Sequence, residues 1–434
     1  MIGLLTALGI IVVLLVIGVP IGFAFAGAVL FLTAYFQLDP GLLLPSAFFQ
    51  TYSVVLLSLP MFIFAGRIMG EGGIATPLIN LAETLVGRVR GGLGIVLVFS
   101  CALFGAISGT ASSAVAAIGT VMIPRMEEAG YPRGYTTGLI SCSSLLGQLI
   151  PPSVPMILFA WITRQSIAAC FLSTVGPGLL MIVLYAFLNW LMCRRIPTIK
   201  VGPRLGLADS LRETGRATRH ASFALMMPVL ILGGIYGGLF TPTEAASVAA
   251  LYGIPVGFWI YKGLTLKKLW QTTIDSAATI GAIVIMFLFI LVASRVFTMQ
   301  QVPQMIVDAL LNISENKIVI LMMANVFLII VGMLMDDISG TLIAAPLLMP
   351  LMLKIGVHPV QFAAIVGTNL AIGANTPPTA PILYLAGRIG GVTIEEFIKP
   401  VAVLLLFGSL PVALATTYWP DLSLFLPRLM GYVH

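Results

Sequence analysis

A double proline interrupts a long apolar segment at two places in this chain. The first interruption lies in 147–155, GQLIPPSVP, and the second in 373–381, GANTPPTAP. Proline removes a backbone donor and breaks a helix, and in a bilayer such irregular backbone persists only where it is buried in protein or lines a cavity. Two matched breaks in apolar surroundings therefore suggest a transport site.

Composition places these breaks in a membrane. Of the 434 residues, 59% are hydrophobic and 9% are charged, with a mean hydropathy of +1.08, whereas about a quarter of the residues in a soluble domain are charged. We therefore expect an all-α polytopic membrane protein. The net charge of +6 is interpreted as a sign of membrane topology, with no nucleic acid among the expected partners.

The N-terminal segment bears on targeting, and the cysteines bear on redox chemistry and metal binding. The apolar segment 1–17 lacks a basic leader and a small-residue cleavage site, which favours a first membrane helix over a signal peptide. The four cysteines are scattered singly, which predicts free thiols and not a metal site.

The apolar segments form two halves of one plan, 1–193 and 223–434, joined by the basic linker 194–222. Each half has five expected crossings, one re-entrant hairpin and one broken helix. The expected crossings are 2–17, 20–36, 57–70, 135–163 and 171–193, then 223–240, 243–261, 276–299, 360–387 and 396–418. The hairpins are 91–124 and 318–350, the broken helices 135–163 and 360–387, and the amphipathic stretches 74–86, 264–273 and 302–312.

An odd number of crossings in each half predicts that the second half is inserted upside down, as in the inverted repeats of secondary transporters. Pro151 and Pro377 differ by 226 positions, as do Pro124 and Pro350. Matching the triplet that begins at Ser108 to the one at 339–341 instead needs an offset of 231. The two hairpins are therefore expected to differ by five residues.

Basic residues favour one orientation in the membrane. With the N-terminus outside, 17 of the 22 Lys and Arg residues lie on the cytoplasmic side, as the positive-inside rule requires. The N-terminus is therefore predicted to be periplasmic and the linker 194–222 cytoplasmic.

Helix ends at the hairpin tips and at the breaks provide the expected cation sites. Each helix end leaves about four carbonyls unpaired at the negative end of its dipole, and hard cations prefer oxygen ligands. The candidate sodium ligands are Ser108, Gly109, Gly147, Leu149 and Pro152 in the first half and Asp337, Ser339, Gly340, Gly373, Asn375 and Pro378 in the second.

The helices that restart beyond the tips and breaks present unpaired N–H groups, which favour an anion. A pocket between the two tips is therefore expected to hold an organic acid beside its coupling cations. Its predicted lining is Thr110, Ser112, Ser153, Asn375, Thr376 and Thr379.

Several of these features also have plain structural interpretations. Small residues often only allow close helix packing, but their recurrence with a break in both halves favours a site. The pair Asp336 and Asp337 could indicate an intramembrane aspartyl protease, yet adjacent aspartates point in different directions, so no enzyme is expected. Arg67 and Arg295 are expected to snorkel or to tie a crossing to the amphipathic stretches, with a direct substrate contact as the alternative.

The chain resembles a known family, the large membrane subunit of tripartite ATP-independent periplasmic (TRAP) transporters, which is DctM-like and part of the ion transporter superfamily. Arg67 stands where this family commonly has an acidic or small residue. The matching stretches are LPMFIFAG at 59–66, GRVRGGL at 87–93, SGTAS at 108–112, IPRM at 123–126, IPPS at 150–153, GPG at 176–178, GGLFTPTEAA at 237–246 and NTPP at 375–378.

This resemblance implies an elevator-type importer in a bacterial inner membrane, in which hairpins and broken helices move as one body against a scaffold. It implies two or more sodium ions and no organic cofactor, and a carboxylate substrate such as sialic acid or a C4-dicarboxylate. The implied partners are a small four-helix membrane subunit, a periplasmic substrate-binding protein and the lipid bilayer. The metal positions that it assigns are Ser108, Gly147, Leu149, Pro152 and Asp337.

Two alternatives stay open at this point. One is a stand-alone sodium-coupled dicarboxylate transporter or cation antiporter with the same inverted repeat. The other is an ion-conducting module of a membrane redox complex, against which the missing cofactor motifs argue.

Overall fold

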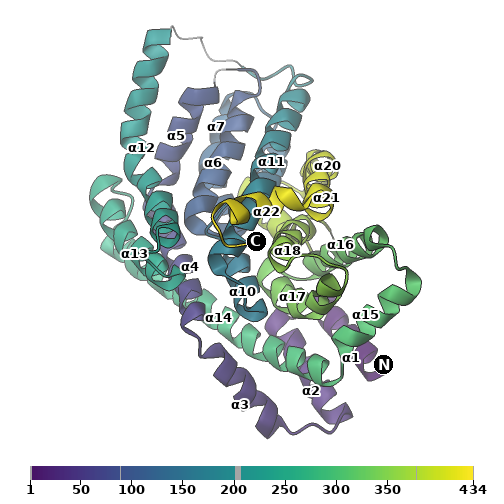
Figure 1. The fold of residues 1–434 in the computed structure, drawn as a ribbon. Helices are drawn as coiled ribbons and strands as arrows, with labels where there is room; N and C mark the ends of the chain where they lie inside the picture. Colours follow the sequence, from purple (N-terminus) through teal and green to yellow (C-terminus); the bar gives the residue numbers. More distant parts are fainter. Residues whose placement is uncertain (1, 88, 201–206, 378, 434) are drawn as a thin grey trace.

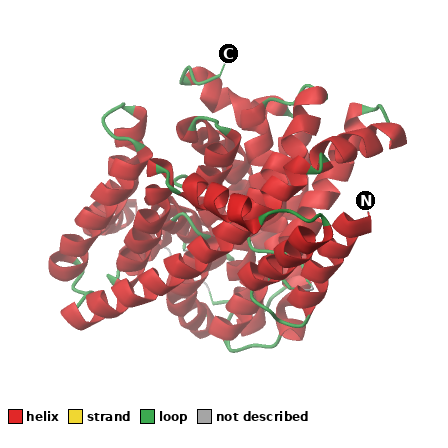
Figure 2. Ribbon diagram, turned by 90° about the horizontal axis from the view of Figure 1, so that it is seen from below, coloured by secondary structure: helices red, strands yellow, loops and turns green. Residues whose placement is uncertain are grey.

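The computed structural model describes residues 2–87, 89–200, 207–377 and 379–433, so the predicted ligand Pro378 lies outside the described residues. Within these ranges every regular element is helical (Figures 1 and 2). The expected all-α fold of a polytopic membrane protein is confirmed.

The first half holds helices α1 to α11. Its first four helices are α1 (Ile2–Val16), α2 (Ile21–Tyr35), α3 (Pro40–Thr51) and α4 (Ser58–Glu71). The helix α5 (Ala75–Val86) follows them and leads into the hairpin. The hairpin is α6 (Gly92–Ser108) and α7 (Ala111–Glu128). The broken helix consists of α8 (Arg133–Ser143), α9 (Leu146–Leu149) and α10 (Val154–Thr163), and α11 (Ile167–Cys193) completes the half.

The second half follows the same order. Its first helices are α12 (Leu207–Tyr236), α13 (Pro242–Pro255), α14 (Leu266–Met299) and α15 (Val302–Ile313). The hairpin is α16 (Lys317–Leu334) and α17 (Asp337–Lys354), and the broken helix is α18 (Pro359–Ala374) and α19 (Pro381–Gly390). The chain ends with α20 (Ile394–Leu404), a π-helical turn (Leu405–Ser409), α21 (Leu410–Tyr418) and α22 (Pro420–Leu429).

The expected difference of five residues between the hairpins is wrong. Helices α7 and α17 begin and end 226 positions apart, and α8 and α18 begin at the same offset. The two Ser-Gly-Thr triplets mislead because they occupy different places. Ser108 is the last residue of α6, whereas Ser339 lies in the first turn of α17. The upside-down relation of the halves stays a prediction.

Two further elements differ from the expected plan. From Leu266 onward, the amphipathic stretch 264–273 and the crossing 276–299 form one helix of 34 residues, α14, because no proline or glycine separates them. Helix α12 likewise contains both the second part of the linker and the next crossing. Helix α3 was not expected, although Asp39 caps it by accepting a hydrogen bond from the N–H of Gly41 at 2.8 Å.

Eight described helices are long and apolar enough to cross a membrane, or nine if α8 to α10 count as one span with its 40° bend. They include α16 and α17, so length alone does not separate a hairpin arm from a crossing. Helices α1 and α2 have 15 residues each, fewer than the roughly 20 that a straight span needs. Their crossing stays a prediction.

Helix α14 runs past α2, α3 and α4, and α4 in turn packs on α13 (Figure 1). On the other side of α4 lies the hairpin α6–α7, which packs on α8, α9 and α19. The first hairpin therefore sits between a layer formed by α4, α13 and α14 and the helices of both breaks.

Local capping signals are reproduced in the structure. Thr241 accepts a hydrogen bond from the N–H of Glu244, and the carboxylate of Glu244 accepts one from the N–H of Thr241 at 2.8 Å. Thr241 and Glu244 thus form a capping box at the start of α13. All four cysteines are free, as predicted, and all four are buried.

A buried polar contact ties α11 to the base of the first hairpin. The hydroxyl of Tyr135 donates to Oδ1 of Asn189 at 2.8 Å, and Nδ2 of Asn189 donates to the carbonyl of Gly91 at 2.8 Å. Asn189 is fully buried. One side chain thus satisfies a donor and an acceptor that water cannot reach.

Replacing Asn189 by Ala is expected to destabilise the protein by about 1–3 kcal/mol, because it leaves both buried groups unpaired. Thermal unfolding of the purified protein in detergent measures this as a lower Tm. Asn312→Ala, at an exposed position in α15, is the matched control and should leave Tm unchanged. An equal Tm for both variants would contradict this role of Asn189.

Candidate functional site

The first hairpin tip lies directly on the backbone of the first broken helix. The N–H of Val154 donates to the carbonyl of Gly109 at 3.2 Å, which links α10 to the tip. Gly109 has a φ of +67°, and a Cβ there would lie 2.7 Å from the carbonyl oxygen of Pro152. The expected meeting of tip and break at one point is confirmed for this half.

Two glycines make this approach possible. A Cβ added to Gly105 would lie 2.5 Å from Cα of Gly147, and one added to Gly147 would lie 2.8 Å from the carbonyl oxygen of Thr110. Real Cβ atoms essentially never come so close. Helix α6 and the short helix α9 therefore touch backbone to backbone, which brings the carbonyl ends of both helices together.

The oxygen atoms around this contact differ in how they are used. The carbonyl of Gly109 is already engaged by Val154. Ser108 is buried, with its hydroxyl 3.5 Å from the carbonyl of Thr110. The hydroxyl of Ser153 is buried and has no hydrogen-bond partner among the described residues. A buried polar atom without a partner is uncommon. Ser153 was predicted for the substrate pocket and not as a sodium ligand, but its position beside the break also suits an oxygen ligand for a hard cation.

Of the other predicted ligands in this half, Gly147 contributes the close contact itself and Leu149 is fully buried. The side chain of Leu149 packs toward Gly178 and Gly367, with its Cδ2 3.8 Å from a Cβ placed on Gly367. Leu149 can therefore offer only its backbone carbonyl to an ion.

The second hairpin meets the second break in a similar way. A Cβ on Gly373 would lie 2.5 Å from Cα of Gly332, so α16 and α18 also touch backbone to backbone. The hydroxyl of Thr379 donates to the carbonyl of Met333 near the end of α16. This hydrogen bond joins the far side of the break to the hairpin.

The second tip is capped by an aspartate. The carboxylate of Asp336 accepts hydrogen bonds from the N–H of Ser339 at 3.3 Å and from its hydroxyl, while Ser339 Oγ also lies 2.8 Å from Sδ of Met286. Ser339 and Gly340 therefore lie in the first turn of α17 and not in the tip loop. Asp337 is the first residue of α17, next to Asp336 at the tip.

Asp336 was not among the predicted ligands, although its carboxylate lies at the second tip. It caps α17 as Thr110 caps α7, 226 positions earlier. The offset of 226 between the halves already indicated this equivalence, but the Ser-Gly-Thr triplets drew attention to Asp337 instead.

Asn375 links the two broken helices. Its Oδ1 accepts a hydrogen bond from the hydroxyl of Ser141 at 2.7 Å, and its Nδ2 donates to the carbonyl of Ser141 at 2.8 Å. Thr376 lies just beyond the end of α18, and its hydroxyl donates to the carbonyl of Ile372 in that helix at 2.8 Å. The side chains of Asn375 and Thr376 are thus engaged by protein.

A cavity of about 590 Å³ opens between the first hairpin and the layer formed by α4 and α14. Ser112 and Ser113, from the first turn of α7, line one side of it, and Arg67 and Lys268 lie on the other. Of the residues predicted for a substrate pocket, Ser112 lines this cavity, and Thr110, Ser153, Asn375, Thr376 and Thr379 do not.

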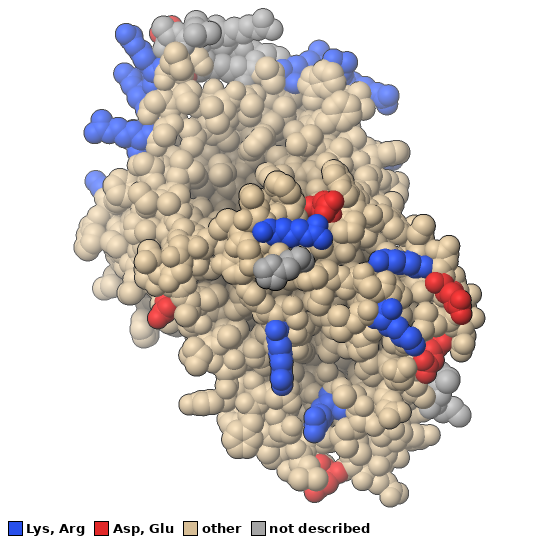
Figure 3. All heavy atoms as spheres, viewed as in Figure 1, with Lys and Arg blue, Asp and Glu red and all other residues tan. Residues whose placement is uncertain are grey.

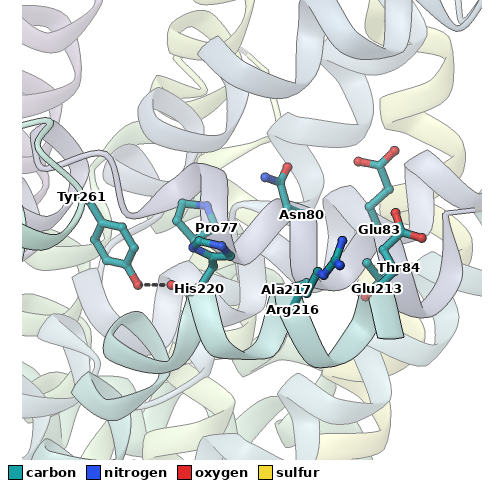
Figure 4. Close-up of a pocket in the computed structure, with 9 residues that line it drawn as sticks. All are labelled: Pro77, Asn80, Glu83, Thr84, Glu213, Arg216, Ala217, His220 and Tyr261. Carbon is teal, nitrogen blue, oxygen red and sulfur yellow. Dashed lines mark hydrogen bonds between the residues drawn. The ribbon is translucent and has the colours of Figure 1, made fainter. Parts of the chain in front are cut away.

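A second cavity of about 560 Å³ lies away from the tips, between α5 and α12 (Figure 4). Asn80 and Glu83 line it from α5, and Arg216 and His220 from α12. The hydroxyl of Tyr261 donates to the carbonyl of His220 at 2.8 Å. The residues that line this second cavity belong to neither of the hairpins and to neither of the breaks.

The family described as tripartite ATP-independent periplasmic transporter, DctM component, matches residues 8–422. The chain belongs to this family. It is therefore a transporter subunit and not an enzyme, and the resemblance inferred from the sequence motifs is confirmed.

Several relatives have named substrates. The chain is 34% identical to the C4-dicarboxylate TRAP transporter large permease protein DctM of Pseudomonas aeruginosa over 87% of each chain. It is 33% identical to the sialic acid large permease SiaM of Vibrio cholerae, again over 87% of each. It is 35% identical to the isethionate permease DctMQ of Oleidesulfovibrio alaskensis, covering 95% of this chain but 64% of that longer protein.

A solved structure supports the fold. The YdaH transporter of Alcanivorax borkumensis aligns over 88% of both chains with a TM-score of 0.58 and 17% sequence identity. At this identity the likeness concerns the fold alone.

Replacing Gly105 by Ala is expected to push the first hairpin away from the break, since the added Cβ has no room against Gly147. Substrate uptake by reconstituted protein should fall at least about tenfold, because an overpacked contact costs about 1–3 kcal/mol and displaces the tip. Gly281→Ala is the control, because a Cβ there meets nothing within 4 Å. Full uptake by the Gly105 variant would contradict the importance of this contact.

Proposed function

We propose that this chain is the large membrane subunit of a sodium-coupled importer that takes up an organic acid delivered by a periplasmic binding protein. The support is membership of the DctM family together with the acids named for relatives: C4-dicarboxylate, sialic acid and isethionate. One further relative, 36% identical, is an ectoine/5-hydroxyectoine permease.

The observation that carries the sodium proposal is the backbone contact between tip and break. It gathers the ends of α6 and α9, and the unpartnered hydroxyl of Ser153 lies beside them. Ser108 and Ser153 would hold the ion together with backbone carbonyls of Gly147 and Leu149. The tip and break of the second half would form a second site, to which Asp336 and Asp337 would give a different charge. Two or more ions are therefore proposed.

The start of α7 favours an anion. Thr110 caps this helix, and Ser112 lines the cavity beside it. Unpaired N–H groups and the positive dipole end stabilise a carboxylate there. A bound cation at the neighbouring tip would lower the cost of removing that carboxylate from water, which couples the two solutes.

An elevator movement is proposed for the transport step. The first hairpin is bound to the broken helices by backbone contacts, whereas its border with α4 and α14 combines a close contact at Gly66 with a cavity. A group of helices that is held together internally, and is partly separated from its neighbours by a cavity, can slide as a unit. Hairpins and breaks would then move against α4, α13 and α14.

The proposed setting is a bacterial inner membrane with the N-terminus in the periplasm and 194–222 in the cytoplasm. Lys and Arg side chains gather at the end of the molecule where α12 begins (Figure 3). This pattern supports the orientation by the positive-inside rule. A small four-helix membrane subunit and a soluble binding protein are the proposed partners.

The test is uptake of labelled succinate, isethionate, sialic acid and ectoine into proteoliposomes that hold the chain with its small subunit and binding protein. We expect one acid to accumulate only with an inward sodium gradient. Ser153→Ala should raise the sodium concentration for half-maximal uptake about tenfold, since a ligand to a charge contributes about 1.5 kcal/mol or more.

Ser222→Ala, at an exposed site in α12, serves as the control and should behave as the unmodified protein. Uptake with unchanged sodium dependence in the Ser153 variant would contradict the proposed ion site. Uptake at full rate without the binding protein would favour the stand-alone transporter or antiporter instead.

A further inference from the structure

Arg67 is a half-buried arginine that lines the cavity between the first hairpin and α14. Its guanidinium donates one hydrogen bond, to the hydroxyl of Thr279 at 2.8 Å. In the part of the chain that the structure describes, no carboxylate lies within 4.0 Å of it. A guanidinium has five N–H donors, so Arg67 keeps several for a partner that the protein does not supply.

The other charged residues of the cavity are differently placed. The ammonium of Lys268 donates to the carbonyl of Gly263 at 3.0 Å, and the carboxylate of Asp275 accepts from Nε2 of Gln271 at 3.0 Å. Glu71 is exposed at the end of α4. Arg67 is thus the charged group of this cavity with uncommitted donors and partial burial.

Arg67 lies close to the hairpin tip. Its neighbour Gly66 touches the tip, because a Cβ there would lie 2.9 Å from Cα of Ser108. Ser112 and Ser113 of α7 line the same cavity from the hairpin side. A cation on α4 therefore faces hydroxyls and the positive start of a helix on α7, and all three favour an anion.

We propose that Arg67 binds the anionic group of the transported acid in this cavity and selects for a carboxylate or sulfonate that a guanidinium can hold through two parallel hydrogen bonds. The volume of about 590 Å³ suits a small organic acid. This inference rests on the proposed function. Helix α4, which carries Arg67, packs on α13 and α14, so Arg67 lies on the side of the cavity opposite the hairpin. Arg67 can bind the acid only while the hairpin faces α4.

The test measures the charge preference of the cavity directly on the purified full chain. A reporter thiol is introduced by Ser112→Cys, with the parent chain as baseline because its four cysteines are buried. The rates of modification by anionic sulfonatoethyl methanethiosulfonate and by cationic trimethylammonioethyl methanethiosulfonate are compared. Their ratio should fall about tenfold in Arg67→Gln, since a charge in a cleft concentrates the opposite ion, and should be retained in Arg67→Lys.

Two controls separate charge from folding. Thr279→Val removes the hydrogen-bond partner of Arg67 but leaves its charge, so the ratio should stay within about twofold of the original. A neutral methanethiosulfonate reports the accessibility of the thiol in every variant. An unchanged ratio in Arg67→Gln, with unchanged neutral reactivity, would overturn the proposal.

Uptake assays then distinguish this inference from the proposed function. If the protein takes up an acid with sodium, but the ratio of the two modification rates does not depend on the charge at position 67, the role of Arg67 is overturned and the transport function stands. If uptake is observed, Arg67→Gln should raise KM for the acid more than it lowers kcat, and Arg67→Lys should restore part of the loss. If the ratio of the two modification rates does depend on the charge at position 67, but the protein transports no acid, the anion site at Arg67 stands and the proposed import function is contradicted.

Discussion

Backbone contact between a hairpin tip and a broken helix is the constraint on which the rest of this structure depends. It is made possible by Gly105 against Gly147 in the first half and by Gly332 against Gly373 in the second. Irregular backbone at membrane depth requires partners inside the protein. Helix packing meets this requirement: α4 covers the first tip, and α18 of the second break packs on both α16 and α17.

The two halves use this common plan unequally. Ser153 and Thr379 occupy equivalent positions after the breaks, yet the hydroxyl of Ser153 has no described partner and that of Thr379 donates to Met333. At the tips, a neutral Thr110 corresponds to a carboxylate at Asp336. One half thus keeps an oxygen free and the other adds charge, which argues against two identical sites.

Sequence reasoning located the elements whose signals are local. Double prolines and the first Ser-Gly-Thr turn act over a few residues, and the breaks and the first tip lie where they were predicted. It failed where the answer depends on distant partners. Nothing near Asn375 in the chain reveals that its amide pairs with Ser141, and nothing beside Arg67 reveals the cavity that it faces.

Sodium binding by the tip and break is the central claim, and thermal unfolding of the purified chain tests it most directly. An ion that binds only the folded state raises Tm as its concentration rises. The account predicts a higher Tm in sodium chloride than in potassium chloride of equal ionic strength, with the difference growing with concentration. Equal Tm values in the two salts at all concentrations would contradict it.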